Sequence, residues 1–114
     1  MESVANIIES IKGDVVVLRA KGKLDTILSP QVEKKGVNLM NAGQLKLVLD
    51  LADISYVNSA GLRMLLSLKK QMKSAGGKFI ICNLRPEVME IMKICGFDHV
   101  LEFAKNEEDA LRQF

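Results

Sequence analysis

The chain has 114 residues, of which 48% are hydrophobic and 26% charged, a composition that suits one soluble domain with one core. Its 16 basic and 14 acidic side chains nearly balance, for a formal net charge of +2, and it has no tryptophan, which argues against a nucleic-acid-binding protein. Its apolar runs are too short to cross a bilayer, and residues 1–10 lack the pattern of a secretory signal, so we expect a cytoplasmic protein without a membrane partner.

The N-terminal part of the chain predicts a hairpin followed by a helix. Isoleucines between residues 7 and 11 favour a first strand, Gly13-Asp14 is a turn signal, and VVVLRA at residues 15–20 favours a second strand. Ser29-Pro30 has the pattern of a serine N-cap followed by a proline at the first helical position. The helix that it opens is expected to end near Gly43.

The remainder predicts strands that alternate with helices. A buried strand at residues 45–51 leads into a helix that begins at Asn58 or Ser59 and ends at Gly76-Gly77. Four further elements are expected, namely a strand at 78–82, a helix from Pro86 to Gly96, a short strand at 100–103 and a helix from Asn106. This order predicts a single α/β domain over residues 1–114, in which a mixed sheet of four to five strands is packed with about four helices.

Residues suited to catalysis or metal binding are scarce. Cys82 and Cys95 lie in apolar surroundings and are expected to be reduced core residues rather than a disulfide. His99 is the only histidine and is expected on the surface or in a loop. A Ser59–His99 dyad stays open, but nothing else supports it, and no closely spaced Cys/His pairs or phosphate-binding loop are present. We therefore expect no enzyme, no metal and no cofactor.

Ser59 stands at the predicted start of a helix, which allows two interpretations. A serine there can simply accept a hydrogen bond from an N–H group that the helix leaves unpaired, and Asn58 could do the same. The free N–H groups and the positive end of the helix dipole also favour phosphate, so a serine here can carry a phosphoryl group without unfolding its domain. The small residues Ala60 and Gly61 would let a partner approach closely.

Several segments together resemble the STAS domain, and specifically the bacterial anti-sigma-factor antagonists. The central segment is LVLDLADISYVNSAGLRMLL at residues 47–66, in which Asn58-Ser59-Ala60-Gly61-Leu62 stands where the family has Asp-Ser-x-Gly-Leu. The family's early Gly-x-Leu-Asp segment is matched by residues 22–25. The later half of the chain also follows the family pattern. Gly76-Gly77 precedes a predicted strand, Leu84-x-Pro86 precedes a predicted helix, and Gly96-Phe97 follows that helix.

The resemblance implies a switch that acts through protein–protein contact. The motif serine, here Ser59, would be phosphorylated by an anti-sigma factor that is itself a serine kinase, and a phosphatase would remove the phosphate. The unphosphorylated protein would bind that anti-sigma factor and free the sigma factor. The residues implied in partner binding are Asp25, Thr26, Asn58, Ser59, Ala60 and Gly61.

One position departs from the family pattern, and a second function stays open. Asn58 replaces the usual aspartate, which keeps a cap but removes a negative charge next to the acceptor. The alternative function is a STAS module that binds protein or nucleotide without being phosphorylated, as a scaffold or as part of a larger regulatory system.

Overall fold

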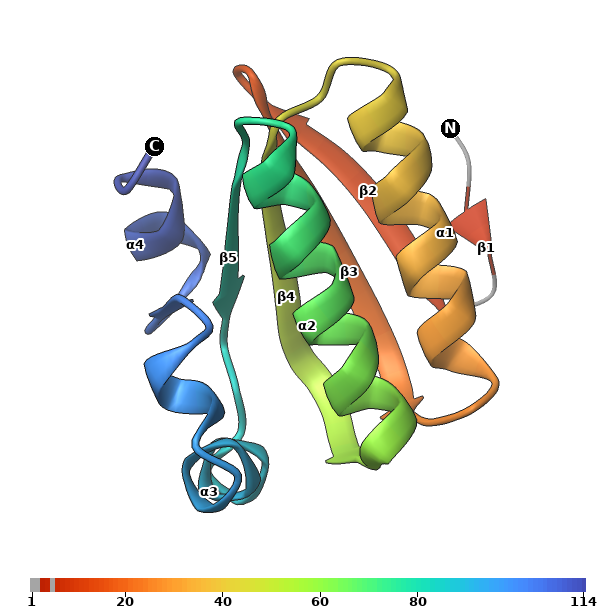
Figure 1. Cartoon of the computed structure of the whole chain (residues 1–114), viewed down its shortest axis with the longest axis vertical. Helices are drawn as coiled ribbons and strands as arrows, with labels where there is room; N and C mark the ends of the chain where they lie inside the picture. Colours follow the sequence, from red (N-terminus) through yellow and green to blue (C-terminus); the bar gives the residue numbers. More distant parts are fainter. Residues whose placement is uncertain (1–2, 5) are drawn as a thin grey trace.

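A mixed sheet of six strands lies at the centre of the described structure, in the spatial order β1-β2-β3-β4-β5-β6 (Figure 1). The computed structural model describes residues 3–4 and 6–114. The strands are β1 Ser3–Val4, β2 Ile7–Lys12, β3 Val15–Leu24, β4 Lys46–Val57, β5 Lys78–Cys82 and β6 Phe103–Ala104. The helices are α1 Leu28–Asn41, α2 Ser59–Ser74, α3 Pro86–Ile94 and α4 Glu107–Leu111, with a 3-10 helix, η1, at Phe97–His99.

Two kinds of strand pairing make the sheet mixed. The pairs β1–β2 and β2–β3 are antiparallel, whereas β3–β4, β4–β5 and β5–β6 are parallel. The predicted mixed sheet packed with about four helices is confirmed, although it has six strands where four to five were predicted. The strands β1 and β6 have only two residues each, which explains why β1 gave no signal in the sequence and why the predicted strand at residues 100–103 forms only at its end.

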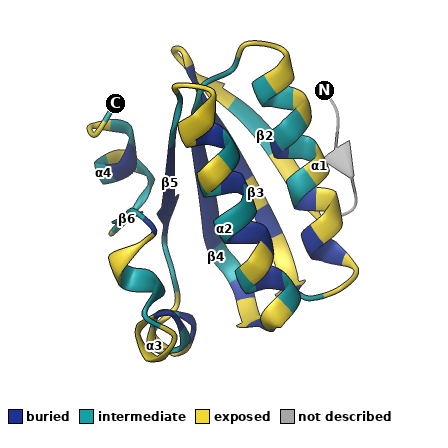
Figure 2. Cartoon of the chain, viewed as in Figure 1, coloured by how far each residue is buried: buried dark blue, intermediate teal, exposed yellow. Residues whose placement is uncertain are grey.

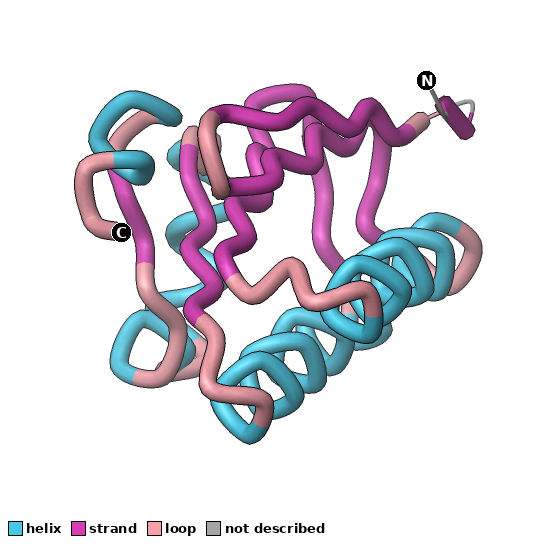
Figure 3. The backbone as a smooth tube through the Cα atoms, turned by 90° about the horizontal axis from the view of Figure 1, so that it is seen from above, coloured by secondary structure: helices cyan, strands magenta, loops and turns pink. Residues whose placement is uncertain are grey.

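The helices α1 and α2 lie side by side in a layer on one face of the sheet (Figures 1 and 3). The buried residues of α2 recur along one side of the helix, as packing on a sheet requires (Figure 2). Gly36 explains how closely the two helices approach, because a Cβ built on it would lie 2.8 Å from Cδ2 of Leu68. Glycine by itself weakens a helix, but at this position it permits α1 to pack closely against α2.

The opposite face of the sheet is covered more sparsely. Ala110 of α4 packs there against the apolar side chains of Val48, Ile80 and Cys82. Burial raises the pKa of the Cys82 thiol to about 12, so the thiol is neutral at physiological pH. Cys82 is therefore the core residue that the sequence predicted, but Cys95, at the end of α3, is exposed and that part of the prediction is wrong.

Three predicted boundaries also differ from the structure. The strand expected to end at Ala20 continues to Leu24, because Gly22 adopts a φ of +116° beside a shift in the β3–β4 register. The next strand continues to Val57 because it stays paired with β3. The first helix begins at Leu28, so Ser29 lies within α1 and is buried rather than forming its N-cap.

The packing of α2 on the sheet generates a stability prediction. Leu65 is fully buried, whereas the adjacent Leu66 is only partly buried. Leu65→Ala should lower the free energy of unfolding by about 2–5 kcal/mol, since a cavity replaces its side chain. Leu66→Ala is the matched control and should lower the free energy of unfolding by clearly less. Urea denaturation of both variants measures the difference, and equal losses would show that the buried face of α2 is assigned wrongly.

The two cysteines should differ sharply toward a thiol reagent. Cys95 should react within minutes in the native protein, because it is exposed. Cys82 should react only after unfolding, because its thiol is buried and its pKa is raised. Intact mass after labelling, with Cys95→Ser as control, counts the modified thiols. Rapid labelling of the native Cys95→Ser variant would contradict the burial of Cys82.

Candidate functional site

The carboxyl ends of β3 and β4 meet at one edge of the sheet, because these neighbouring strands run parallel and stay paired as far as Leu24 and Val57 (Figure 1). Each is followed there by a turn into a helix, and such edges are where α/β folds place their sites. The hydrogen bond from the Asn58 N–H to the Leu24 carbonyl, at 3.1 Å, joins the ends of β3 and β4. The segments around Asp25 and Ser59, far apart in the sequence, are thereby brought together.

Asn58 is the N-cap of α2. Its side-chain oxygen accepts hydrogen bonds from the N–H groups of Ala60 and Gly61, at 2.9 and 3.2 Å. Ser59 is the first residue of the helix and is exposed. Among the described residues its hydroxyl has no hydrogen-bond partner, since Asn58 provides the cap. Capping therefore does not require Ser59, and its oxygen is available to chemistry from outside.

Gly61 fixes how closely the first turn of α2 approaches the sheet. A Cβ built on it would lie 2.6 Å from the carbonyl oxygen of Leu24 and 2.9 Å from Cγ1 of Val57. Gly61 is buried, so it does not provide the open surface that the sequence suggested. Its role is to let α2 begin directly on the ends of β3 and β4.

Asp25 organises the turn between β3 and α1. Its Oδ1 accepts hydrogen bonds from the N–H groups of Ile27 and Leu28, both at 3.0 Å. The bonds from Leu28 and Ile27 hold the pKa of this carboxyl below its ordinary value, so Asp25 is ionised at neutral pH. It performs the capping that the sequence assigned to Ser29, and the neighbouring Thr26 is exposed.

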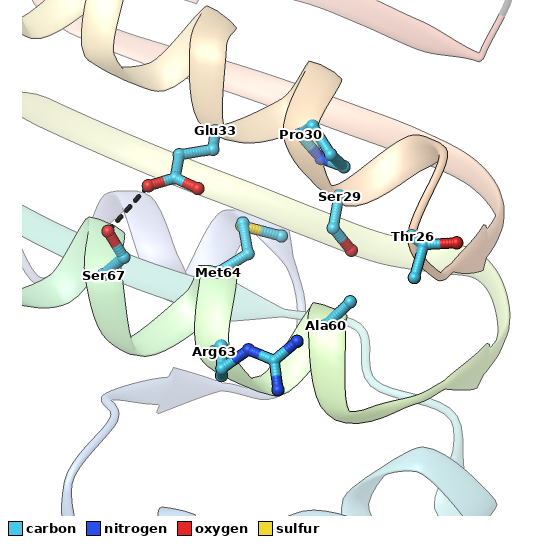
Figure 4. A pocket seen from close by; sticks show the side chains of 8 residues that line it. All are labelled: Thr26, Ser29, Pro30, Glu33, Ala60, Arg63, Met64 and Ser67. Atoms are coloured by element: carbon cyan, nitrogen blue, oxygen red, sulfur yellow. Dashed lines mark hydrogen bonds between the residues drawn. The ribbon is translucent and has the colours of Figure 1, made fainter.

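A groove of about 380 Å³ runs between the first turns of α1 and α2 (Figure 4). Thr26 and Ala60, two of the predicted partner-binding residues, line it together, whereas Asp25 lines a separate depression. Sequence analysis had not singled out Arg63, and it had placed Ser29 at the N-cap that opens the first helix. The groove is lined by eight residues from α1, α2 and the turn before α1: Thr26, Ser29, Pro30, Glu33, Ala60, Arg63, Met64 and Ser67.

The edge of the sheet that holds the groove also carries exposed apolar side chains. Ile27 and Tyr56 are large apolar side chains at this edge, 73% and 48% exposed. His99 lies exposed in η1, as predicted, and no hydrogen bond joins it to Ser59 among the described residues. The part of the chain that the structure describes also contains no group of three or more His, Cys, Asp or Glu residues arranged for a metal. Every described helix is too short or too polar to serve as a membrane span.

The family follows from comparison of the sequence with known proteins. A model of the STAS domain matches residues 6–110, so the chain belongs to the STAS domain family. One relative is BtrV of Bordetella bronchiseptica, named as a candidate anti-sigma factor antagonist. It is 32% identical over 94 residues, which span 82% of this chain and 81% of BtrV. The expected resemblance to the anti-sigma-factor antagonists is confirmed.

Solved structures show the same fold. A crystal structure from Thermotoga maritima, of another candidate anti-sigma factor antagonist, has a TM-score of 0.88 and 21% identity, covering 94% of this chain and 92% of that one. The anti-sigma factor antagonist SpoIIAA in its unphosphorylated form has a TM-score of 0.74 and 20% identity, covering 94% and 96%. A structure of SpoIIAA from Bacillus in the phosphorylated form has a TM-score of 0.72 and 20% identity, covering 94% and 97%. At these identities the likeness shows the fold alone.

The packing of Gly61 leads to a prediction at the site. Alanine normally favours a helix over glycine by about 1 kcal/mol, yet Gly61→Ala should destabilise the protein by about 1–3 kcal/mol because backbone atoms cannot yield to the new methyl group. Gly36→Ala is the control, since the atoms nearest its methyl group would be side-chain ends alone, of Leu68 at 2.8 Å and of Leu47 at an ordinary 3.7 Å. Thermal unfolding should rank Gly61→Ala below Gly36→Ala, and the reverse order would contradict the close approach.

Proposed function

We propose that this protein is an anti-sigma factor antagonist that binds a kinase-type anti-sigma factor and is released when Ser59 is phosphorylated. Membership of the STAS family and the names of its relatives support the first part. The observation that carries the second part is the exposed, unpartnered hydroxyl of Ser59 at the first position of α2. Such a protein would act in the cytoplasm, where sigma factors act.

In this proposal the switch is a covalent change on the surface. The γ-phosphoryl group of ATP passes to the Ser59 oxygen, the hydroxyl proton is lost, and ADP leaves. The phosphate adds a charge of about −1.5 to −2 and three acceptor oxygens. The free domain tolerates this anion because the N-terminal end of a helix stabilises negative charge by about 0.3–1 kcal/mol at an exposed site. Asn58 continues to provide the cap, so folding does not depend on the state of Ser59.

The same phosphate opposes a close protein interface. It is bulky and must lose its hydration when the partner covers it. A thousandfold loss of affinity requires only about 4 kcal/mol, which a buried and unpaired charge readily costs. Ile27 and Tyr56 supply apolar area nearby, and Asp25, Thr26 and Ala60 supply polar and small contacts. A phosphatase that removes the phosphate would restore binding.

The experiment is a comparison of Ser59 variants. Ser59→Ala should bind the anti-sigma factor as tightly as the unmodified protein, whereas Ser59→Asp should bind much more weakly, since a carboxylate imitates part of the phosphate charge. Ser74→Asp is the matched control, because it places the same charge at the exposed far end of α2. Calorimetric titration measures affinity, and circular dichroism confirms that each variant folds.

Two further measurements separate the phosphorylation switch from a STAS module that binds its partner without being phosphorylated. Incubation with the anti-sigma factor and ATP should add one phosphoryl mass to the unmodified protein and none to Ser59→Ala. Asp25→Asn should weaken binding with little change in melting temperature, because the new side chain keeps an oxygen for the Ile27 and Leu28 N–H groups. Equal affinities of the Ser59 variants, with no added mass, would leave a STAS module that binds without being phosphorylated.

A further inference from the structure

Arg63 occupies the position on α2 from which a cation can reach Ser59. The two residues are four apart, so they lie one turn apart on the same side of the helix. Long side chains of a helix point back toward its N-terminus, and in Figure 4 the Arg63 side chain extends toward the turn that holds Ala60. Arg63 is exposed at the rim of the groove, so its guanidinium is free to move.

Arg63 also differs from the other three arginines of the chain. Arg19 pairs with Asp53, Arg85 donates to the carbonyl of Ala52, and Arg112 pairs with two carboxylates of α4. Within residues 3–4 and 6–114, Arg63 has neither an ion-pair partner nor a side-chain hydrogen bond. Its guanidinium therefore lies near the site without contributing an ion pair or a hydrogen bond to the fold.

The groove next to Arg63 contains a second polar group without a partner. Ser29 is only 2% exposed, and its hydroxyl forms no hydrogen bond with the described residues. In Figure 4 this hydroxyl points from α1 toward the groove and the first turn of α2. A buried hydroxyl is costly to leave unpaired, so an oxyanion or its bound water at this place would gain a donor.

The acidic groups around the site are already engaged. The Glu33 carboxylate of α1 accepts hydrogen bonds from Ser67 and Gln71. Asp25 is held by backbone N–H groups, and Lys23 of β3 lies close enough to act on its charge. No carboxylate of the described residues competes for Arg63, and an added anion near α2 would find that cation available.

We propose that Arg63 is the counter-ion of the phosphate on Ser59, with the Ser29 hydroxyl as an additional donor at the groove. This rests on the proposed function, because it assumes that Ser59 carries the phosphate. Guanidinium and phosphate form strong, bidentate hydrogen bonds. Phosphorylation then alters the docking surface twice: it adds a dianion at Ser59, and it withdraws the cation of Arg63 from the partner's reach.

The test uses the full chain with phosphoserine placed at position 59 during translation, so that it needs neither kinase nor anti-sigma factor. Titration by ³¹P NMR gives the second pKa of the phosphate, ordinarily about 6. A nearby cation favours the dianion and lowers that pKa. Arg63→Gln should therefore raise it by about half a unit or more, whereas Lys70→Gln, which removes one charge farther along α2, should leave it unchanged.

A second signal reports on the guanidinium itself. The Nε–H resonance of Arg63 should shift between the serine and phosphoserine forms of the chain, and Ser29→Ala should reduce that shift. An unchanged phosphate pKa in Arg63→Gln, with that variant shown to be folded by circular dichroism, would overturn the proposal. Since no partner is present, the result is independent of whether phosphorylation weakens binding, and failure of the switch would be seen separately in the calorimetric titration.

Discussion

The site depends on the close contact between the first turn of α2 and the end of β3. The Leu24 carbonyl accepts the Asn58 N–H, and it also fills the space in which a side chain on Gly61 would lie. This contact is possible because β3 and β4 stay paired as far as Leu24 and Val57. If the strands separated earlier, the helix would begin away from the sheet, and Asp25 and Ser59 would not share one edge.

The division of roles between Asn58 and Ser59 follows from this contact. A helix that starts abruptly leaves several N–H groups unpaired, and Asn58 satisfies those of Ala60 and Gly61. The neutral Asn58 side chain does this without adding charge beside the hydroxyl. Because Asn58 provides the cap, a change at the exposed side chain of Ser59 need not disturb the helix that presents it.

Most of the fold could be predicted from the sequence because the apolar residues of each long element recur with a clear spacing. The apolar spacing of α2 and the continuous apolar runs of β4 and β5 depend on local pattern alone. The ends of β3 and β4 were missed because a shift in register and a positive φ at Gly22 carry the pairing past a residue that usually breaks a strand. Cys95 was misplaced because apolar neighbours in sequence do not determine which side of α3 faces solvent.

The site could be predicted only in part, because the sequence shows local patterns but not the contacts that the fold creates. Asn58 and Ser59 are visible in the sequence because caps have a recognisable composition. Ser29 satisfied the same rule, yet Asp25 provides the N-terminal hydrogen bonds of α1 and Ser29 is drawn inside. Arg63 gave no signal, since its importance depends on which cations of the folded chain already have partners.

The tight fit of α1 against α2 at Gly36 and Leu68 has a consequence for how related proteins can diverge. Helices packed this closely have little freedom to move against each other, so differences between related proteins are accommodated more easily on the exposed surface. Ile27 and Tyr56 stand on that surface and belong to neither buried cluster. They can change in evolution with little cost to folding, so that related proteins can present different exposed side chains on an unchanged scaffold.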